Sequence, residues 1–163
     1  MKGESVYLIW KVVHVIAVVL FLGNIITGVF WAFHAHSTRD PKIIAHAFEG
    51  ISRSDRWFTM PGVTLLTIAG LAAAINAGFP ILGSGWIFWS LLLLIVSGLA
   101  FMFQVGPLQR RIAALARAGQ SGQFDWARYD SLRRSWGVWG GIATLAPLIA
   151  LVIMVLKPNL PGL

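Results

Sequence analysis

Cysteine is absent from the sequence. Its absence excludes disulfides, thiolate nucleophiles, cysteine-ligated zinc and iron–sulfur clusters. The sequence also lacks a glycine-rich phosphate loop and an H-E-x-x-H motif, which are common signatures of nucleotide hydrolysis and of zinc proteases. Any chemistry or binding must therefore depend on other residue types.

Charged residues are scarce, at 12% of a 163-residue chain, whereas hydrophobic residues make up 57%. An ordinary soluble domain carries about 25% charged residues, so lipid is the expected solvent for most of the surface. On a soluble fold, a net charge of +7 would suggest that the protein binds nucleic acid. Here the basic residues are sorted by their position between hydrophobic runs, and we expect no nucleic-acid partner.

Four hydrophobic runs are long enough to cross a bilayer, which requires about 20 predominantly apolar residues in a helix. They cover residues 6–33, 57–78, 86–105 and 136–156. The last three contain no charged residue. The sequence therefore predicts an all-α, polytopic membrane protein, with four transmembrane helices in a bundle that forms a single domain over residues 1–163 in a lipid bilayer.

The basic residues predict the orientation of this bundle. Four lysines or arginines fall in the connection 34–56 and six in the connection 106–135, which together make ten of the thirteen in the chain. By the positive-inside rule, both long connections are expected in the cytoplasm and both termini outside.

Each long connection also carries a short amphipathic pattern. Asp40 followed by Pro41 is typical of a helix start, and apolar residues recur at helical spacing over residues 43–51. Pro107 is expected to interrupt the third span, and a second apolar face follows over residues 108–116. We expect two short cytoplasmic helices that lie in the membrane interface.

One histidine lies inside a predicted span. His14 is about eight residues into the first run, or about 12 Å below the outer end of the helix. A neutral imidazole at that depth can ligate haem iron or bond a neighbouring helix, and both interpretations stay open. Lys11 lies on nearly the same helix face. It is either the partner of a haem propionate or a side chain that snorkels to the surface.

A haem held by His14 has no second histidine within the predicted spans. His34 is twenty residues further along, about 30 Å away on the same helix. The second axial position would fall to a methionine, of which Met154 is nearest the same side, or to His14 of a second copy in a homodimer.

The sequence offers one further group for a metal ion. His34, His36 and His46 gather at the predicted cytoplasmic side, with Asp40 and Glu49 nearby. They form a candidate divalent-metal site, and the alternative is that all three histidines are solvated at the interface. No carboxylate lies within the four runs, which argues against an ion-coupled transporter.

Polar residues within the runs are expected to join the helices. Five of them can hydrogen-bond between helices where lipid offers no competing partner, namely Asn24, Thr64, Thr67, Asn76 and Gln104. Pro147 is expected to kink the fourth span, because it cannot donate the backbone hydrogen bond four residues back.

Several short motifs are spread along nearly the whole chain. They are Lys11-x-x-His14, Asp55-Arg56-Trp57-Phe58 with Pro61-Gly62, Gly85-Trp86, and Pro107-Leu108-Gln109-Arg110-Arg111. Together they resemble a bacterial family of predicted four-helix integral membrane proteins of unknown function. The resemblance implies that architecture and a location in the bacterial inner membrane.

The segment Trp10-Lys11-x-x-His14 is also similar to the first span of HemJ-type protoporphyrinogen oxidases. The four-helix plan is similar to the membrane domain of CopD-type copper-resistance proteins. The first similarity implies haem b at His14, although the Leu-Pro-Arg segment of that family is replaced here by residues 28–31.

We expect one of two functions, and only the first of them involves an enzymatic or redox activity. The first is a haem b protein that transfers electrons to a membrane redox partner or oxidises a tetrapyrrole. The second is a non-enzymatic membrane accessory or metal-handling protein without haem, in which His14 is only hydrogen-bonded.

Overall fold

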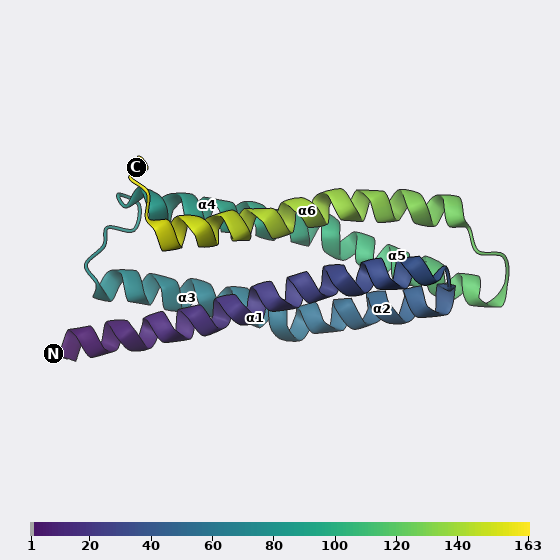
Figure 1. Cartoon of the computed structure of the whole chain (residues 1–163), viewed down its shortest axis with the longest axis horizontal. Helices are drawn as coiled ribbons and strands as arrows, with labels where there is room; N and C mark the ends of the chain where they lie inside the picture. Colours follow the sequence, from purple (N-terminus) through teal and green to yellow (C-terminus); the bar gives the residue numbers. More distant parts are fainter. Residues whose placement is uncertain (1) are drawn as a thin grey trace.

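The computed structural model describes residues 2–163, in which every regular element is a helix. The α-helices of this described part are α1 (Lys2–Thr38), α2 (Pro41–Ser54), α3 (Met60–Asn76), α4 (Gly85–Ala100), α5 (Gly106–Ala118) and α6 (Trp126–Leu156). Two π-helical segments, η1 (Asp55–Thr59) and η2 (Phe101–Val105), join α2 to α3 and α4 to α5 without a break. A 3₁₀ turn, η3 (Gly119–Ser121), follows α5. The described chain thus forms four long helices (Figure 1), which confirms the predicted all-α architecture.

All four long helices are long and apolar enough to cross a membrane. The spanning stretches among the described residues are Glu4–Thr38, Pro41–Asn76, Gly85–Ala118 and Trp126–Leu156. Both chain ends and the connection 77–84 lie together at one end of the bundle, here called the terminal end (Figure 1). The connections 39–40 and 119–125 lie at the opposite end, here called the connection end.

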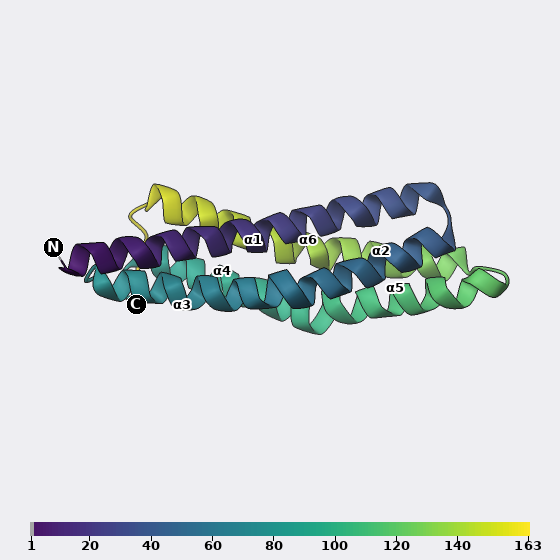
Figure 2. The same ribbon diagram turned by 90° about the horizontal axis from the view of Figure 1, so that it is seen from below.

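The two amphipathic helices exist as predicted, but their surroundings differ from the prediction. Helices α2 and α5 continue α3 and α4 toward the connection end, where they lie side by side (Figure 2). Ile44 and Phe48 of α2 and Ile112 of α5 are completely buried. The apolar faces of these helices are therefore covered by protein, whereas their placement in the membrane interface stays a prediction.

Prolines account for the two π-helical segments. Pro61 and Pro107 each follow a π-helical segment by two residues. A proline cannot donate a backbone hydrogen bond, and its ring clashes with the carbonyl four residues back, so the preceding turn widens. The Met60 N–H accordingly donates to the Asp55 carbonyl, five residues back. Pro107 widens its helix without ending it, and the expected interruption of the third span is wrong.

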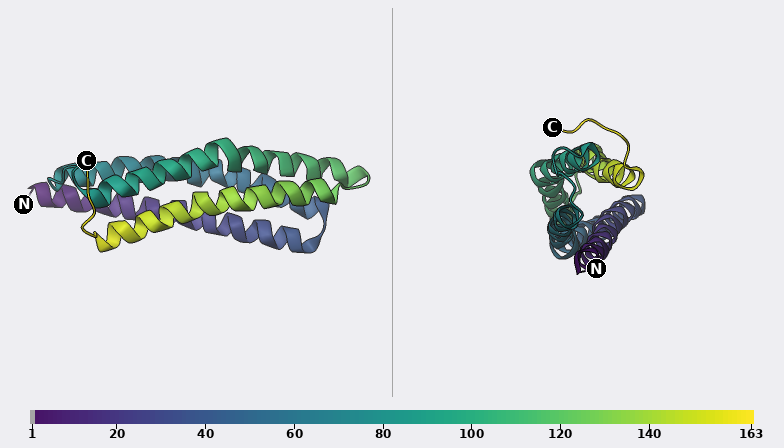
Figure 3. Two further views of the ribbon diagram at one scale, coloured as in Figure 1. Left: turned by 90° about the horizontal axis from the view of Figure 1, so that it is seen from above. Right: turned by 90° about the vertical axis from the view of Figure 1, so that its left-hand side faces the viewer.

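The bundle is closed at the connection end and divided at the terminal end. Phe48 and Tyr129 belong to one buried cluster to which all four long helices contribute. At the terminal end α1 pairs with α3 and α4 with α6, and no described Cα atom of α3 lies within 8 Å of one of α4. Figure 3 shows the two pairs separated in the end-on view. Leu94 and Leu148 pack against a smaller cluster around Leu66, so the pairs meet near the middle.

Candidate binding site at the helix junction

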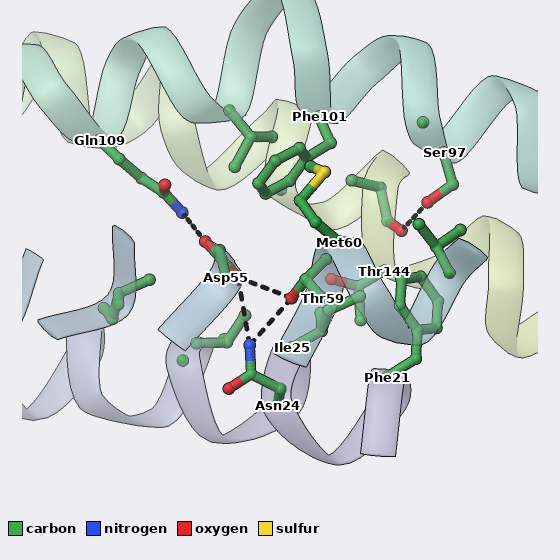
Figure 4. Close-up of a pocket in the computed structure, with 18 of the residues that line it drawn as sticks. Phe21, Asn24, Ile25, Asp55, Thr59, Met60, Ser97, Phe101, Gln109 and Thr144 are labelled. Carbon is green, nitrogen blue, oxygen red and sulfur yellow. Dashed lines mark hydrogen bonds between the residues drawn. The ribbon is translucent and has the colours of Figure 1, made fainter. Parts of the chain in front are cut away.

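A buried carboxylate lies where the helices meet. Asp55, the first residue of η1, is 7% exposed and accepts hydrogen bonds from three side chains (Figure 4). Its Oδ1 accepts from Asn24 Nδ2 at 3.2 Å and from Thr59 Oγ1 at 2.8 Å. Its Oδ2 accepts from Gln109 Nε2 at 3.1 Å. These bonds connect the first three long helices through one side chain.

The widened turn of η1 helps to shape this polar group. Thr59 lies four residues after Asp55, so its hydroxyl can reach back to the carboxylate. The same Thr59 oxygen accepts from Asn24 Nδ2 at 2.9 Å. The ion pairs of the described residues do not include Asp55, although buried charges are usually paired. Neutral donors are therefore its partners in this structure.

A cavity of about 170 Å³ adjoins the polar group. All four long helices line it, and its wall is mostly apolar, with aromatic and methionine side chains such as Phe101 and Met60 (Figure 4). Asp55 lies two residues before the apolar run 57–78, so the polar group lies at one end of that run. The cavity therefore combines a polar side with an apolar wall.

Trp136 of α6 lines the same cavity and has an unused donor. Its side chain is buried, at 6% exposure. Its indole Nε1 is buried as well and has no hydrogen-bond partner among the described residues. An indole N–H can only donate, and buried polar atoms without partners are rare in folded proteins. The indole donor of Trp136 is thus enclosed by protein without an acceptor among the described residues.

His14 joins α1 to α3. Its Nδ1 lies 2.7 Å from the backbone oxygen of Leu66, and because a carbonyl only accepts, Nδ1 is the protonated nitrogen. The ring also covers Gly70, where an added Cβ would lie 2.8 Å from Nδ1. The residues that line the junction cavity do not include His14. Its observed contact is the interhelical hydrogen bond, the second of the two interpretations drawn from the sequence.

The other residues expected around a haem lie apart from the cavity. The Lys11 side chain is exposed, and its Nζ lies 5.6 Å from the centre of the Tyr7 ring. Neither Lys11 nor Met154 lines the junction cavity. Of the expected haem-binding residues, His14 alone has a ring that is held in place by a hydrogen bond through Nδ1. One such ligand fits a haem iron only in part, so haem ligation stays a prediction.

The three remaining histidines make separate contacts. His34 is exposed and stacks on Phe30 with ring centres 6.3 Å apart. The His36 Nδ1 lies 3.3 Å from the Tyr129 hydroxyl oxygen, and His46 is exposed on α2. Among the described residues, no group of three or more histidine, aspartate or glutamate side chains is placed to hold a metal ion. The candidate metal site gains no support.

The two carboxylates expected beside those histidines have other partners. Asp40 Oδ1 accepts from the Lys42 backbone N–H at 2.7 Å and caps α2, which confirms the predicted helix start. Glu49 forms an ion pair and hydrogen bonds with Arg117 of α5. Both side chains therefore stabilise the connection end of the bundle.

Of the polar residues expected to join helices, Asn24 does so. Thr64, Thr67 and Asn76 donate instead to carbonyls four residues earlier in α3, at 3.0, 2.7 and 2.8 Å, and the prediction for these three is wrong. Ser97 of α4, by contrast, donates to a carbonyl of α6 at 2.6 Å. The hydrophobic pattern of the sequence does not distinguish hydrogen bonds within one helix from those between two helices.

Sequence reasoning missed Asp55, Gln109 and Trp136 as parts of one site. Asp55 lies outside the predicted span 57–78, but the helix that carries this span begins at Pro41 and includes it. The sequence argument that no carboxylate lies within a span therefore considered only part of this helix. One available signal was the position of Asp55 and Gln109 within a few residues of Pro61 and Pro107, because prolines inside long helices often mark widened turns.

Comparisons with known proteins identify the chain by family. Residues 8–158 match the family described as predicted integral membrane protein (DUF2269). No curated protein and no solved structure matches the chain. The matched range includes all the side chains of the junction cavity.

Proposed function

Because the chain belongs to this family of integral membrane proteins, we propose that it is a non-enzymatic membrane protein that binds a small amphipathic molecule at the helix junction. The observation that carries this proposal is the cavity, where buried polar groups on one side meet an apolar wall. Pockets for small molecules commonly combine an apolar lining with a few placed polar groups.

The position of the cavity supports a defined orientation for the ligand. Asp55 and Gln109 lie at the boundary of the membrane-crossing part, whereas Phe21, Val63 and Leu94 line the cavity from within the apolar runs. A polar end would lie near Asp55 and an apolar part would extend toward the terminal end. The separation of α3 from α4 there gives an apolar tail a route toward lipid.

The chemistry of the lining favours binding over catalysis. Among the described residues that line the cavity, Asp55 is the one ionisable side chain. General acid–base and covalent catalysis usually need a second group, such as a histidine or lysine, beside the first. The neutral amides and hydroxyl around Asp55 are instead suited to orient a polar group.

Filling the cavity tests the proposal. Gly140 of α6 lines the cavity, and a Cβ added there meets no atom within 4 Å, so Gly140→Leu would occupy the space. Gly137 on the same helix is exposed, does not line the cavity and is equally open. Gly137→Leu is thus a matched control for the change in helix propensity.

Native mass spectrometry of protein purified in mild detergent gives the measurement. Wild type and Gly137→Leu should carry a copurified small molecule in a fixed ratio, and Gly140→Leu should lose it while remaining folded. Equal occupancy in the three proteins, or no bound molecule in any of them, would refute a ligand-binding role.

Haem b at His14 is a second candidate, favoured by the hydrogen bond to Leu66. A protonated Nδ1 fixed by a carbonyl leaves Nε2 free to bind iron, which is the usual arrangement for a histidine ligand. A Soret band that disappears in His14→Ala would support this function, with a redox partner or a second copy as further requirements. Protein that shows no Soret shift after incubation with haem would exclude it.

We also infer the orientation from the basic residues of the connection end. Ten of the thirteen lysines and arginines lie between residues 39 and 134, so the connections should face the cytoplasm of a bacterial inner membrane. A reporter fused at residue 120 should be active only if it is one that works in the cytoplasm. The opposite result would invert the orientation.

A further inference from the structure

We infer that the outer face of α2 and η1 binds one anionic phospholipid, with its phosphate at Arg53 and its acyl chains over Trp57 and Phe58. An open groove on this face, here called the outer groove, is lined by Gly50, Arg53, Ser54, Trp57 and Phe58. None of these residues lines the junction cavity. The outer groove is therefore a second site, and the inference goes beyond the proposed function.

The outer groove lies on the face of this helix that no other helix covers. Ile51 and Thr59 are buried on the opposite face. On the groove side Trp57 is 70% exposed and Phe58 is 50% exposed. Gly50 is exposed as well, and a Cβ added there would meet no atom within 4 Å, so the missing side chain leaves the groove open. Large aromatic side chains exposed together mark a surface that contacts lipid or another partner.

Unpaired positive charge lies beside these aromatic rings. Arg53 and Arg56 are both exposed and are neighbours on the helix surface, and neither has an ion-pair partner among the described residues. The nearest carboxylates along the chain have other partners. Glu49 pairs with Arg117, and Asp55 is bonded to neutral side chains on the inner side (Figure 4). The outer groove is thus positive, and no carboxylate of the described chain lines it.

This charge selects the headgroup of the lipid. The planar guanidinium of an arginine forms paired hydrogen bonds with phosphate oxygens. Phosphatidylglycerol carries such a phosphate and no balancing cation. Phosphatidylethanolamine and phosphatidylcholine also carry an ammonium group, which would lie beside Arg53 and Arg56 with no carboxylate in the groove to bind it. A phospholipid with a net negative charge therefore matches the outer groove.

The order of residues along the helix matches the order of layers in a membrane. Arg53 lies toward the connection end, whereas Trp57 and Phe58 begin the apolar run 57–78 toward the terminal end. The step from Arg53 to Phe58 rises about 7.5 Å along a helix, and the headgroup layer on each side of a bilayer is about 5–8 Å thick. Tryptophan favours that layer. A lipid whose phosphate contacts Arg53 can therefore place its chains against Phe58.

Two lipids with the same acyl chains test the headgroup. Phosphatidylglycerol and phosphatidylcholine are added to wild-type protein in mild detergent, and native mass spectrometry measures the bound fraction. Phosphatidylglycerol should bind at least about fivefold more tightly, and equal affinities would overturn the inference. Glycerol 3-phosphate, which lacks the chains, should not displace the bound lipid at equal concentration. If it does, the groove binds free phosphate and the lipid inference is overturned.

Variants locate the binding. Arg53→Gln should weaken binding of phosphatidylglycerol about fivefold to tenfold. Arg134 of α6 is exposed and does not line the outer groove, so Arg134→Gln controls for the loss of one positive charge and should bind as wild type does. Gly50→Leu fills the groove without a clash and should also weaken binding. Gly137→Leu, on the exposed side of α6, is its control.

Gly140→Leu separates this inference from the proposed function, because it fills the junction cavity and should leave the binding of phosphatidylglycerol unchanged. If Gly140→Leu abolishes that binding and Gly50→Leu retains it, the lipid belongs to the junction cavity. The groove inference then fails while the proposed function gains support. The inference also fails if Arg53→Gln and Arg134→Gln bind alike. A wild-type dimer that Gly50→Leu separates would overturn it too, because a second copy would then occupy the groove.

Discussion

The helices of this bundle pack differently at its two ends. At the connection end α2, α5, the end of α1 and the start of α6 enclose one continuous core, in which Phe48 and Tyr129 are completely buried. At the terminal end α1 packs with α3 and α4 packs with α6, and large apolar residues such as Ile9 and Val155 face outward. The part richest in hydrophobic residues is thus the part with less of a shared core.

The surrounding solvent explains this difference. Where charged residues indicate water or headgroups, burial of apolar surface is strongly favourable and drives the helices into one core. Within lipid, apolar side chains gain little by leaving the surface, and helices associate through small residues and hydrogen bonds. The junction cavity adjoins the shared core, on the side where the helices divide into two pairs.

The largest expected effect comes from the closed core. Phe48 is completely buried in α2, whereas Phe30 of α1 is 62% exposed. Phe48→Ala should lower the free energy of unfolding by about 3–5 kcal/mol, and Phe30→Ala by less than about 0.5 kcal/mol. Denaturation in detergent, followed by circular dichroism, measures both. Similar losses for the two variants would contradict the contrast between the ends.

Removal of the junction carboxylate should have the next largest effect. Asp55→Ala leaves the donors of Asn24, Thr59 and Gln109 without their acceptor, and we expect a loss of about 2–3 kcal/mol in the free energy of unfolding. Thr64→Ala serves as the control, because that hydroxyl bonds only its own helix. An Asp55→Ala protein as stable as the control would show that the group does not hold the helices together.

A smaller effect is expected where α1 meets α3. A Cβ at Gly70 would lie 2.8 Å from His14 Nδ1, so Gly70→Ala should displace the ring and cost about 1–2 kcal/mol. In a His14→Ala background the same change should be nearly neutral, because the clash is gone. Gly23→Ala is the control, since its added Cβ meets nothing within 4 Å. Additive costs in the double variant would argue against this contact.

The smallest effect should come from the surface ion pair of the connection end. Glu49 and Arg117 are joined across α2 and α5, but their side chains are 40% and 67% exposed. Glu49→Gln should change the free energy of unfolding by no more than about 0.5 kcal/mol, and less at high salt. A loss comparable to that of Asp55→Ala would mean that the connection end is stabilised by charge more than by its core.

The architecture could be predicted because each hydrophobic run is long enough to cross the hydrocarbon layer of a bilayer. Hydropathy also located the amphipathic segments around Phe48 and Ile112, but it could not show that these two faces cover each other. That pairing depends on tertiary geometry, in particular on the widened turns before Pro61 and Pro107 that keep each long helix continuous.

The candidate site was harder to predict because its residues come from separate parts of the chain. Asn24, Asp55, Gln109 and Trp136 lie on four different long helices, and no spacing rule connects them. His14 drew attention because it is isolated in an apolar run, yet its observed partner is a backbone carbonyl, which no sequence pattern encodes.

The length of the helices determines how the molecule would stand in a bilayer. The helix Pro41–Asn76 has 36 residues, or about 54 Å at 1.5 Å per residue, whereas the hydrocarbon layer is about 30 Å thick. The apolar runs occupy the terminal end, so the excess projects on the other side. Electron micrographs of the protein in a lipid disc should show protein density projecting from one face only. That asymmetry would distinguish the two leaflets without any label.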